Sequence, residues 1–142
     1  MATRTATAQW NGTLKEGNGT MAGGSGGFEM PFTYKSRFEG EGANPEELIG
    51  AALAGCFSMQ VSTDLAEAGT PVESVRTEAR VQLRMGDEGP YIASIALTAR
   101  GRVPGLDDAA FKAAAETAKS GCIVSRALAA VGDITVDAAL EG

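Results

Sequence analysis

Short alternating segments near the N-terminus predict β-strands. Residues 5–10 alternate in size and polarity and lead into Asn11-Gly12, a pair typical of hairpin turns. Residues 15–27 are rich in glycine and predict a flexible connection, and residues 28–38 have the composition of one or two short strands. The N-terminal part of the chain is therefore expected to consist of short strands joined by turns.

A longer alternation predicts a hairpin in the second half of the chain. Apolar positions from Val75 to Leu83 alternate with charged or polar ones, which places the charged side chains on a solvated face. A turn signal over residues 86–90 lies between the two arms, so the hairpin is expected over residues 72–103. Residues 133–139 predict a final strand.

The segment between these strand regions begins and ends as a helix does. Asn44 is a good N-cap, Pro45 suits the first helical position, and Glu47 stands where a capping box needs a carboxylate. Gly69 is expected to end the helix. Residues 48–61 are apolar on almost every side, which is typical of a helix that is buried on every side. A chain of 142 residues covers such a helix poorly by itself, so we expect a homodimer.

Two further helices are expected before the last strand. Asp107 caps one over residues 108–119, and Gly121 separates it from a short helix over residues 122–131. Antiparallel strands and helices in separate runs predict an α+β fold. The length and the absence of a linker predict a single domain over residues 1–142.

Composition excludes several classes of function. The net charge of -6 argues against nucleic acid as a partner, because phosphate binding needs a basic surface. The longest apolar stretch is interrupted by polar residues, so no membrane span is predicted, and the N-terminus lacks the apolar region of a signal peptide. We therefore expect a cytoplasmic protein, in which a disulfide would be catalytic or redox-sensing rather than structural.

The candidate chemistry depends on two cysteines, Cys56 and Cys122, in a sequence that contains no histidine. Without imidazole, Cys-His and Ser-His catalytic pairs are excluded, and two sulfurs alone cannot complete a four-ligand zinc site. No metal and no bound cofactor are therefore expected. Thiol chemistry and two inert core cysteines remain as alternatives.

Each cysteine has a reactive and a structural interpretation. Cys56 has neighbours typical of a core, and apolar burial would suppress the reactivity of its thiol. A reactive Cys56 needs a nearby cation, and Arg37, just before the long helix, is the candidate. Cys122 follows Gly121 at a predicted helix start, where free backbone N–H groups stabilise a thiolate.

Glu46 lies in the first turn of the long helix, where carboxylates are common because they complement the helix dipole. It stands ten positions before Cys56, which is about 15 Å along the axis at about 1.5 Å per residue. Glu46 therefore cannot touch the sulfur of its own helix. Any role at the thiol requires the Glu46 of a second subunit, with two such helices packed antiparallel.

Three segments together resemble the OsmC (osmotically inducible protein C) branch of the OsmC/Ohr family of thiol peroxidases. The first segment is Arg37-Phe38-Glu39-Gly40. The second contains Asn44-Pro45-Glu46-Glu47-Leu48-Ile49-Gly50-Ala51-Ala52 and, after two further residues, Gly55-Cys56-Phe57-Ser58-Met59. The third is Ala118-Lys119-Ser120-Gly121-Cys122-Ile123-Val124-Ser125. The order of the predicted strands and helices also fits, so the resemblance covers nearly the whole chain. The position of the arginine, after the N-terminal strands, is similar to the OsmC branch.

The resemblance implies an OsmC-like fold with a central buried helix, in an intertwined homodimer with active sites at the subunit interface. It implies reduction of organic hydroperoxides, and less well of hydrogen peroxide. By position, Cys56 matches the peroxidatic cysteine that becomes a sulfenic acid, and Cys122 the resolving cysteine that forms a disulfide with it. Arg37 matches the arginine that activates the thiol, and Glu46 the carboxylate that holds it. An external dithiol, of the lipoyl type, would restore the enzyme.

Apolar peroxides are the expected substrates. Phe38, Phe57 and Met59 are candidates to contact the substrate's tail, although each is also explained as a core residue. Two other functions stay open at this point. One is a redox sensor that forms the same disulfide but acts through a partner, and the other is a small-molecule binding module with structural cysteines.

Overall fold

The computed structural model of the chain describes residues 1–141. These residues form two compact units, which divide between Leu48 and Ile49. Each unit is built around its own three-stranded sheet. The single domain expected over residues 1–142 stays a prediction.

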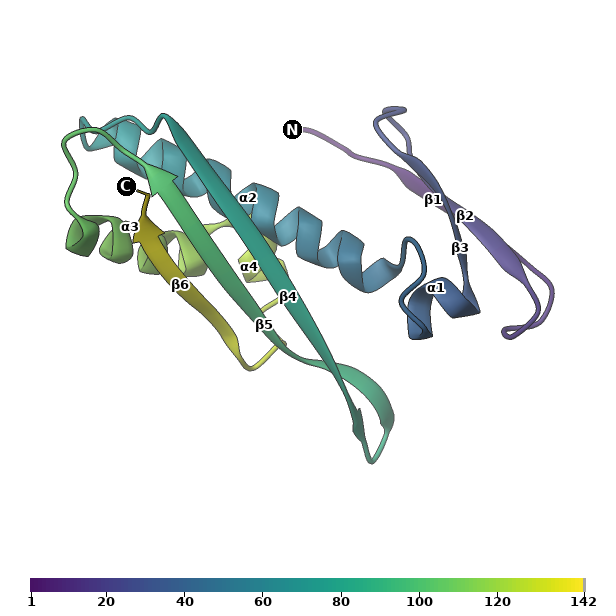
Figure 1. Cartoon of the computed structure of the whole chain (residues 1–142). Coiled ribbons are helices and arrows are strands. Elements are labelled where there is room, and N and C mark those ends of the chain that lie inside the picture. Colours follow the sequence, from purple (N-terminus) through teal and green to yellow (C-terminus); the bar gives the residue numbers. More distant parts are fainter. Residues whose placement is uncertain (142) are drawn as a thin grey trace. The chain divides into compact units, whose positions relative to one another are not determined.

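The first unit contains an antiparallel sheet in the order β1-β2-β3 (Figure 1). Its strands are β1 (Ala6–Asn11), β2 (Asn18–Gly23) and β3 (Glu29–Thr33). The hairpin predicted at Asn11-Gly12 is confirmed. Asn11 pairs with Asn18, and the connection between them begins at Gly12 with a φ of 89°, a conformation that favours glycine.

Strand β2 corrects the sequence prediction, because it lies inside the segment that was expected to be a flexible connection. Pairing with a strand on each side outweighs its glycine content. At Gly19 the missing side chain is required, since a Cβ there would lie 2.8 Å from the ring of Trp10 and 2.7 Å from the ring of Phe32. The two rings lie 5.2 Å apart between centroids and cover this part of the sheet.

Helix α1 (Tyr34–Phe38) is a second correction, because the sequence predicted strands up to residue 38. Thr33 and Ser36 form a reciprocal cap at its start. The Ser36 N–H donates to Thr33 Oγ1 at 3.1 Å, and the Thr33 N–H donates to Ser36 Oγ at 2.8 Å. This local pairing of side chains with backbone turns the chain from the sheet into a helix.

Helix α2 (Pro45–Glu67) confirms the predicted long helix and its N-cap. The Glu47 N–H donates to Asn44 Oδ1 at 2.8 Å, and Gly69, with a φ of 86°, follows the end of the helix. One stripe of the helix is buried, and it consists of Gly50, Leu53, Phe57, Val61 and Leu65.

The opposite side of α2 is apolar but exposed in this chain, and it includes Ala51, Ala52, Gly55 and Met59. The expectation of a helix buried on every side is therefore not met within one chain. By length and composition alone α2 could also cross a membrane, but core helices of soluble proteins meet the same criterion, so this is weak support for a membrane span.

The second unit has a sheet in the order β4-β5-β6, with α2 and α3 on one of its faces (Figure 1). The strands are β4 (Ser74–Gly86), β5 (Gly89–Arg102) and β6 (Ile134–Leu140), and the helices after β5 are α3 (Asp108–Gly121) and α4 (Ile123–Ala127). The predicted hairpin is confirmed as β4 and β5, with an irregularity between Gln82 and Leu83.

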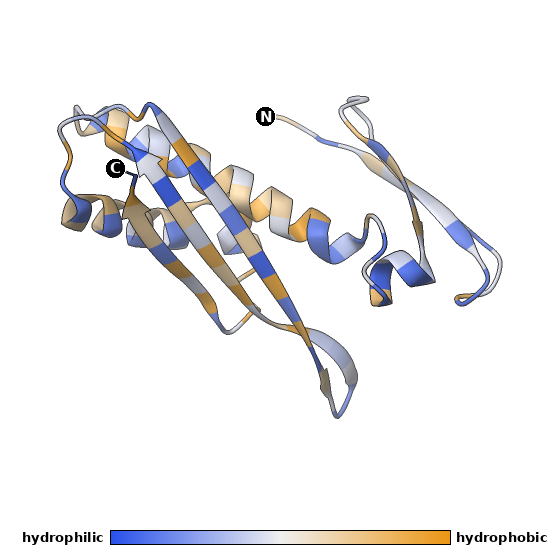
Figure 2. Cartoon of the chain, viewed as in Figure 1, coloured by the Kyte–Doolittle hydropathy of each residue, from blue (hydrophilic) through white to orange (hydrophobic). Residues whose placement is uncertain are grey.

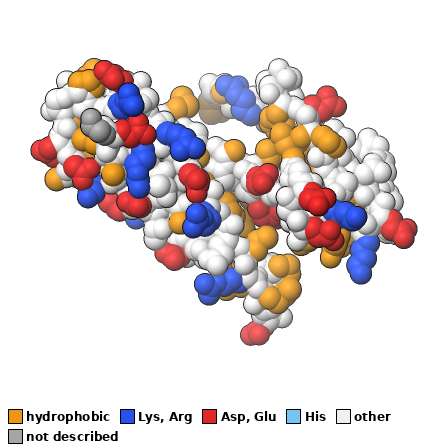
Figure 3. Space-filling view, viewed as in Figure 1, with side chains coloured by type: hydrophobic (Ala, Val, Ile, Leu, Met, Phe, Trp, Pro, Cys, Tyr) orange, Lys and Arg blue, Asp and Glu red, His pale blue; other side chains and the backbone are white. Residues whose placement is uncertain are grey.

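The charged face predicted for this hairpin is also confirmed. Hydrophobic and hydrophilic residues alternate along β4 (Figure 2), and Arg76, Glu78 and Arg80 are exposed. Acidic and basic side chains are intermixed on the side shown in Figure 3.

Strand β6 corrects one further prediction, since it pairs with β5 in parallel rather than antiparallel. The connection between them contains α3 and α4, which is long enough to return the chain to the same end of the sheet. Asp107 caps α3 as predicted, accepting from the Ala110 N–H at 2.8 Å. Helix α4 is shorter than the predicted range of residues 122–131.

The core of the second unit lies between the sheet and the helices. Fully buried side chains come from α2, β5 and α3, and the largest are Leu53, Phe57, Val61, Ile95, Leu97 and Phe111. Gly101 on β5 allows α3 to approach, because a Cβ there would lie 2.6 Å from the ring of Phe111. Cys122 belongs to the same core and is also fully buried.

Candidate active site

Arg37 and Glu46 form an ion pair within one chain. Arg37 Nη2 lies 2.7 Å from Glu46 Oε1, and Arg37 Nε donates to Oε1 at 3.1 Å. Two N–H donors on one carboxylate fix both the position and the plane of the guanidinium. The side chain of Arg37 is 42% exposed and that of Glu46 is 13% exposed, so the guanidinium keeps a free surface while the carboxylate is held by the fold.

The local structure around this pair explains its geometry. Arg37 is in the last turn of α1, and Glu46 is in the first turn of α2. Buried Asn44 links the two helices, because its side chain caps α2 and its Nδ2 lies 3.5 Å from the carbonyl oxygen of Ser36. The pairing of these two residues, expected from the family resemblance, is therefore present in the structure.

A small aromatic pocket lies beside Arg37, with a volume of about 190 Å³. Its walls are Trp10, Leu14, Phe32, Thr33, Tyr34, Arg37 and Phe38. The rings of Tyr34 and Phe38 have centroids 4.8 Å apart, and the guanidinium carbon of Arg37 lies 5.4 Å from the Phe38 centroid. The pocket thus combines an apolar wall with a cation.

The sequence predicts a role for Phe38 in such a pocket, but Trp10, Phe32 and Tyr34 were not among the predicted residues. The i, i+4 spacing of Tyr34 and Phe38 is a signal for contact on a helix, but the segment was expected to be a strand. Phe57 is predicted for the same role, yet it is fully buried in the core of the second unit. Met59 is 73% exposed on α2.

The two cysteines are free and contribute to the same core. Cys56, on α2, is half-buried and packs against that core, whereas Cys122 lies within it. Access therefore differs between the two sulfurs, since only Cys56 is partly open to solvent in this chain.

Cys122 is the residue before α4 and caps it with sulfur. The Ser125 N–H donates to Cys122 Sγ at 3.3 Å, and Ser125 Oγ lies 3.0 Å from the same sulfur. The sequence predicted backbone donors at this sulfur, and the Ser125 N–H is one. The contact with the Ser125 hydroxyl is not among the sequence predictions.

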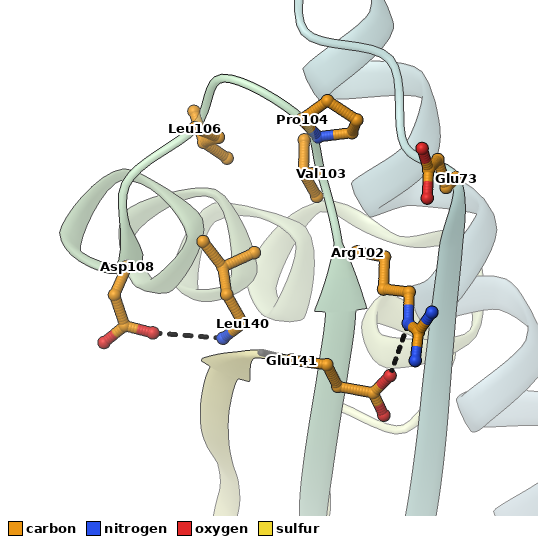
Figure 4. A pocket seen from close by; sticks show the side chains of 8 residues that line it. All are labelled: Glu73, Arg102, Val103, Pro104, Leu106, Asp108, Leu140 and Glu141. Carbon is orange, nitrogen blue, oxygen red and sulfur yellow. Dashed lines mark hydrogen bonds and ion pairs between the residues drawn. The ribbon is translucent and has the colours of Figure 1, made fainter.

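A larger pocket of about 650 Å³ lies at the end of the second unit's sheet (Figure 4). Three of its charged residues are already engaged with neighbours: Arg102 Nε lies 3.1 Å from Glu141 Oε2, and Asp108 Oδ1 accepts from the Leu140 N–H at 3.0 Å. Asp108 also pairs with Lys112. The hydrogen bond from Lys112 contributes most to lowering the pKa of Asp108, and the hydrogen bond from the Leu140 N–H contributes next. No cysteine lines this pocket.

Within residues 1–141 no group of three or more Cys, Asp or Glu side chains could hold a metal ion.

Comparison with known proteins connects these features to one family. The family model described as OsmC-like protein matches residues 38–137. Peroxiredoxin OsmC of Escherichia coli (strain K12) is 46% identical over 136 residues, which cover 94% of this chain and 94% of the relative. Peroxiredoxin OsmC of Shigella flexneri matches to the same extent.

Solved structures agree on the fold. The organic hydroperoxide resistance protein OsmC of Legionella pneumophila has a TM-score of 0.73 at 23% identity, with 100% of both chains covered. The organic hydroperoxide resistance protein OhrB of Bacillus subtilis has a TM-score of 0.70 at 21% identity, with 96% of this chain and 98% of that chain covered. At these identities the likeness shows the fold, and the predicted α+β class is confirmed.

Proposed function

Because the chain belongs to the family of OsmC-like proteins, we propose that it is a thiol peroxidase that reduces organic hydroperoxides to alcohols. The observation that carries the proposal is the Arg37–Glu46 ion pair, at 2.7 Å, beside an aromatic pocket. Two free cysteines that share one core supply the thiol chemistry. The chemistry requires no prosthetic group.

The first step is oxidation of Cys56. Its thiolate attacks one peroxide oxygen, the O–O bond breaks, and the sulfur becomes a sulfenic acid while the alkoxide takes a proton and leaves as alcohol. Arg37 stabilises the thiolate by its charge, and its N–H donors also polarise the peroxide and stabilise the departing alkoxide. Glu46 holds the guanidinium in the orientation that this requires.

The second step is resolution by Cys122. Its sulfur attacks the sulfenic acid, water leaves, and a Cys56–Cys122 disulfide forms. An external dithiol then reduces this disulfide by two thiol–disulfide exchanges and is itself oxidised to a disulfide. We propose a lipoyl-type dithiol for this role and a cytoplasmic location, where both cysteines are kept reduced between turnovers.

The active site is completed across a homodimer. The ion pair fixes Arg37 to the first turn of α2, while Cys56 is ten positions further along that helix, about 15 Å away along its axis. The Arg37–Glu46 pair of one chain therefore serves the Cys56 of the other. The exposed apolar side of α2, with Ala51, Gly55 and Met59, is the surface that a second copy would cover.

The pocket beside Arg37 fits the apolar tail of an organic hydroperoxide. Its aromatic walls would hold the hydrocarbon, and the adjacent guanidinium would hold the peroxide group. This arrangement supports a preference for organic hydroperoxides over hydrogen peroxide. Of the residues named from sequence for this role, Phe38 is retained, whereas the burial of Phe57 in the core favours a packing role.

A steady-state peroxidase assay tests the proposal. The chain should consume cumene hydroperoxide through many turnovers with dihydrolipoamide, more slowly with thioredoxin, and less well with hydrogen peroxide as substrate. Cys56→Ser should abolish consumption, and full activity in this variant would exclude the mechanism. A redox sensor would form the disulfide without repeated turnover, and structural cysteines would react with neither a peroxide nor a disulfide reagent.

A further inference from the structure

Ser125 is a buried polar residue whose side chain is directed at a sulfur. Only 6% of the residue is exposed, and its Oγ lies 3.0 Å from Cys122 Sγ. Within residues 1–141 its hydroxyl has no other hydrogen-bond partner, and its backbone N–H donates to the same sulfur at 3.3 Å. Both polar hydrogens of Ser125 are thus available to one atom.

The chemistry of sulfur makes this arrangement more favourable for a thiolate than for a thiol. A neutral thiol is a weak hydrogen-bond acceptor, so it compensates poorly for the burial of a hydroxyl. A thiolate accepts charge-assisted hydrogen bonds, which are shorter and stronger than neutral ones. Cys122 is fully buried, so the protein has to supply the donors that water would otherwise provide.

We propose that Ser125 is a positioning residue for the resolving step, a proposal that rests on the peroxidase function above. Its O–H and N–H hold Cys122 Sγ in one orientation and stabilise its thiolate. When that thiolate attacks the Cys56 sulfenic acid, the S–S bond forms, the S–O bond breaks, and the hydroxide takes up the proton that Cys122 released, which gives water. The sulfur then carries no charge, and its two hydrogen bonds to Ser125 weaken.

A single-turnover experiment separates this role from a purely structural one. One equivalent of cumene hydroperoxide is mixed with the reduced protein, and quenched samples are examined by mass spectrometry for Cys56 sulfenic acid, trapped with a cyclic dione, and for the disulfide. In Ser125→Ala the sulfenic acid should form at the wild-type rate, but its conversion to the disulfide should slow by about tenfold, as expected for the loss of one hydrogen bond to a charged sulfur. With excess peroxide, Cys56 should then overoxidise to the sulfinic acid.

Matched variants control for the loss of a buried hydroxyl. Ser58 is half-buried in the same unit, and its hydroxyl bonds the Thr77 hydroxyl at 2.7 Å instead of a sulfur, so Ser58→Ala should leave the resolution rate unchanged. Ser125→Thr keeps the hydroxyl and should restore most of the wild-type rate. Resolution in Ser125→Ala as fast as in the wild type would overturn the inference while leaving the peroxidase function intact.

A second measurement needs no variant. The Ser125 amide should exchange its hydrogen more slowly in the reduced protein than in the disulfide form, because its acceptor sulfur moves into the new bond. Equal exchange rates in the two forms would contradict the proposal. If the wild type forms no Cys56–Cys122 disulfide after peroxide treatment, the proposed function itself fails, and this inference fails with it.

Discussion

Glu46 and Glu47 are adjacent carboxylates with different surroundings, and together they allow the role of the ion pair to be tested. Glu46 binds Arg37 at 2.7 Å, whereas the side chain of Glu47 is exposed. Glu46→Gln keeps the shape but removes the charge, so Arg37 loses its fixed orientation. We expect oxidation of Cys56 to slow about 10- to 100-fold, the equivalent of a charged hydrogen bond of about 1.5–3 kcal/mol.

The rate of Cys56 oxidation by cumene hydroperoxide, followed by stopped flow, measures this effect. Glu47→Gln is the control and should keep the wild-type rate, since it alters the charge of the same helix turn without touching Arg37. An equal loss of the Cys56 oxidation rate in both variants would mean that the effect comes from the negative charge in the first turn of α2. An unchanged rate in Glu46→Gln would remove Glu46 from the mechanism.

Phe38 allows the apolar pocket to be tested at the same scale. It is 48% exposed and forms a wall of the pocket beside Arg37. Phe38→Ala should raise the KM for cumene hydroperoxide about tenfold, because burying an aromatic side chain contributes roughly 1.5–3 kcal/mol, while the rate with hydrogen peroxide stays the same. Phe28→Ala, at an aromatic residue 40% exposed outside the pocket, should change neither value.

Individual residues were predictable where a local pattern carried the information. The Asn44 cap and the Arg37–Glu46 pair follow from short segments of sequence or from family resemblance, and both are present. The contact of Ser125 with Cys122 was not predicted, because a serine three positions after a cysteine has no local signal for its burial. Its environment depends on how α3 and α4 pack, which is tertiary information.

Among the elements, the link between α3 and β6 gives a prediction about pH. Asp108 accepts from Lys112 at 2.9 Å and from the Leu140 N–H at 3.0 Å, and these bonds lower its pKa in the folded protein. A carboxylate whose pKa is lower in the folded than in the unfolded protein stabilises the fold at pH values above its unfolded pKa. This contribution is lost as the pH falls through the pKa of the folded protein. Asp108→Asn should therefore reduce stability at pH 7 and have no effect in strong acid.

Urea unfolding of the wild type and Asp108→Asn measures the difference in their free energies of unfolding. It is done once at neutral pH and once at a pH well below the ordinary pKa of aspartate. Asp87→Asn serves as the control, because Asp87 is exposed in the turn between β4 and β5. It should not change the unfolding free energy at either pH. A constant difference between the wild type and Asp108→Asn across the acid range would show that the substitution acts through packing instead of charge.

Helices and strands were predictable from sequence where the pattern of apolar and polar positions extends over many residues. The β4–β5 hairpin and α2 extend over many residues, so their patterns were unambiguous. Strand β2 and helix α1 are short, and their sequences do not have a repeat long enough to distinguish them from loop or strand. The parallel pairing of β6 with β5 was missed because direction depends on the connection, which a strand's own sequence does not record.

For the whole molecule, the predicted dimer has a direct consequence for variants in trans. In a mixed dimer, one chain carries Cys56→Ser and lacks the thiol, and the other chain carries Arg37→Ala and lacks the cation. If each site takes Cys56 from one chain and Arg37 from the second, a mixed dimer contains one intact site. Random pairing gives mixed dimers half of the time, so co-expression should restore about a quarter of the wild-type activity.

The measurement is peroxidase activity of the co-expressed pair, purified through two different tags so that only mixed dimers are retained. These dimers should have about half of the wild-type activity per dimer, while each variant alone is inactive. Sedimentation of the wild type should give twice the chain mass. If Arg37 acted on the Cys56 of its own chain, every site in the mixed dimer would be defective, and no activity would return. The experiment thus tests the dimer and the origin of the cation together, because the Arg37–Glu46 ion pair that holds the cation is formed within one chain.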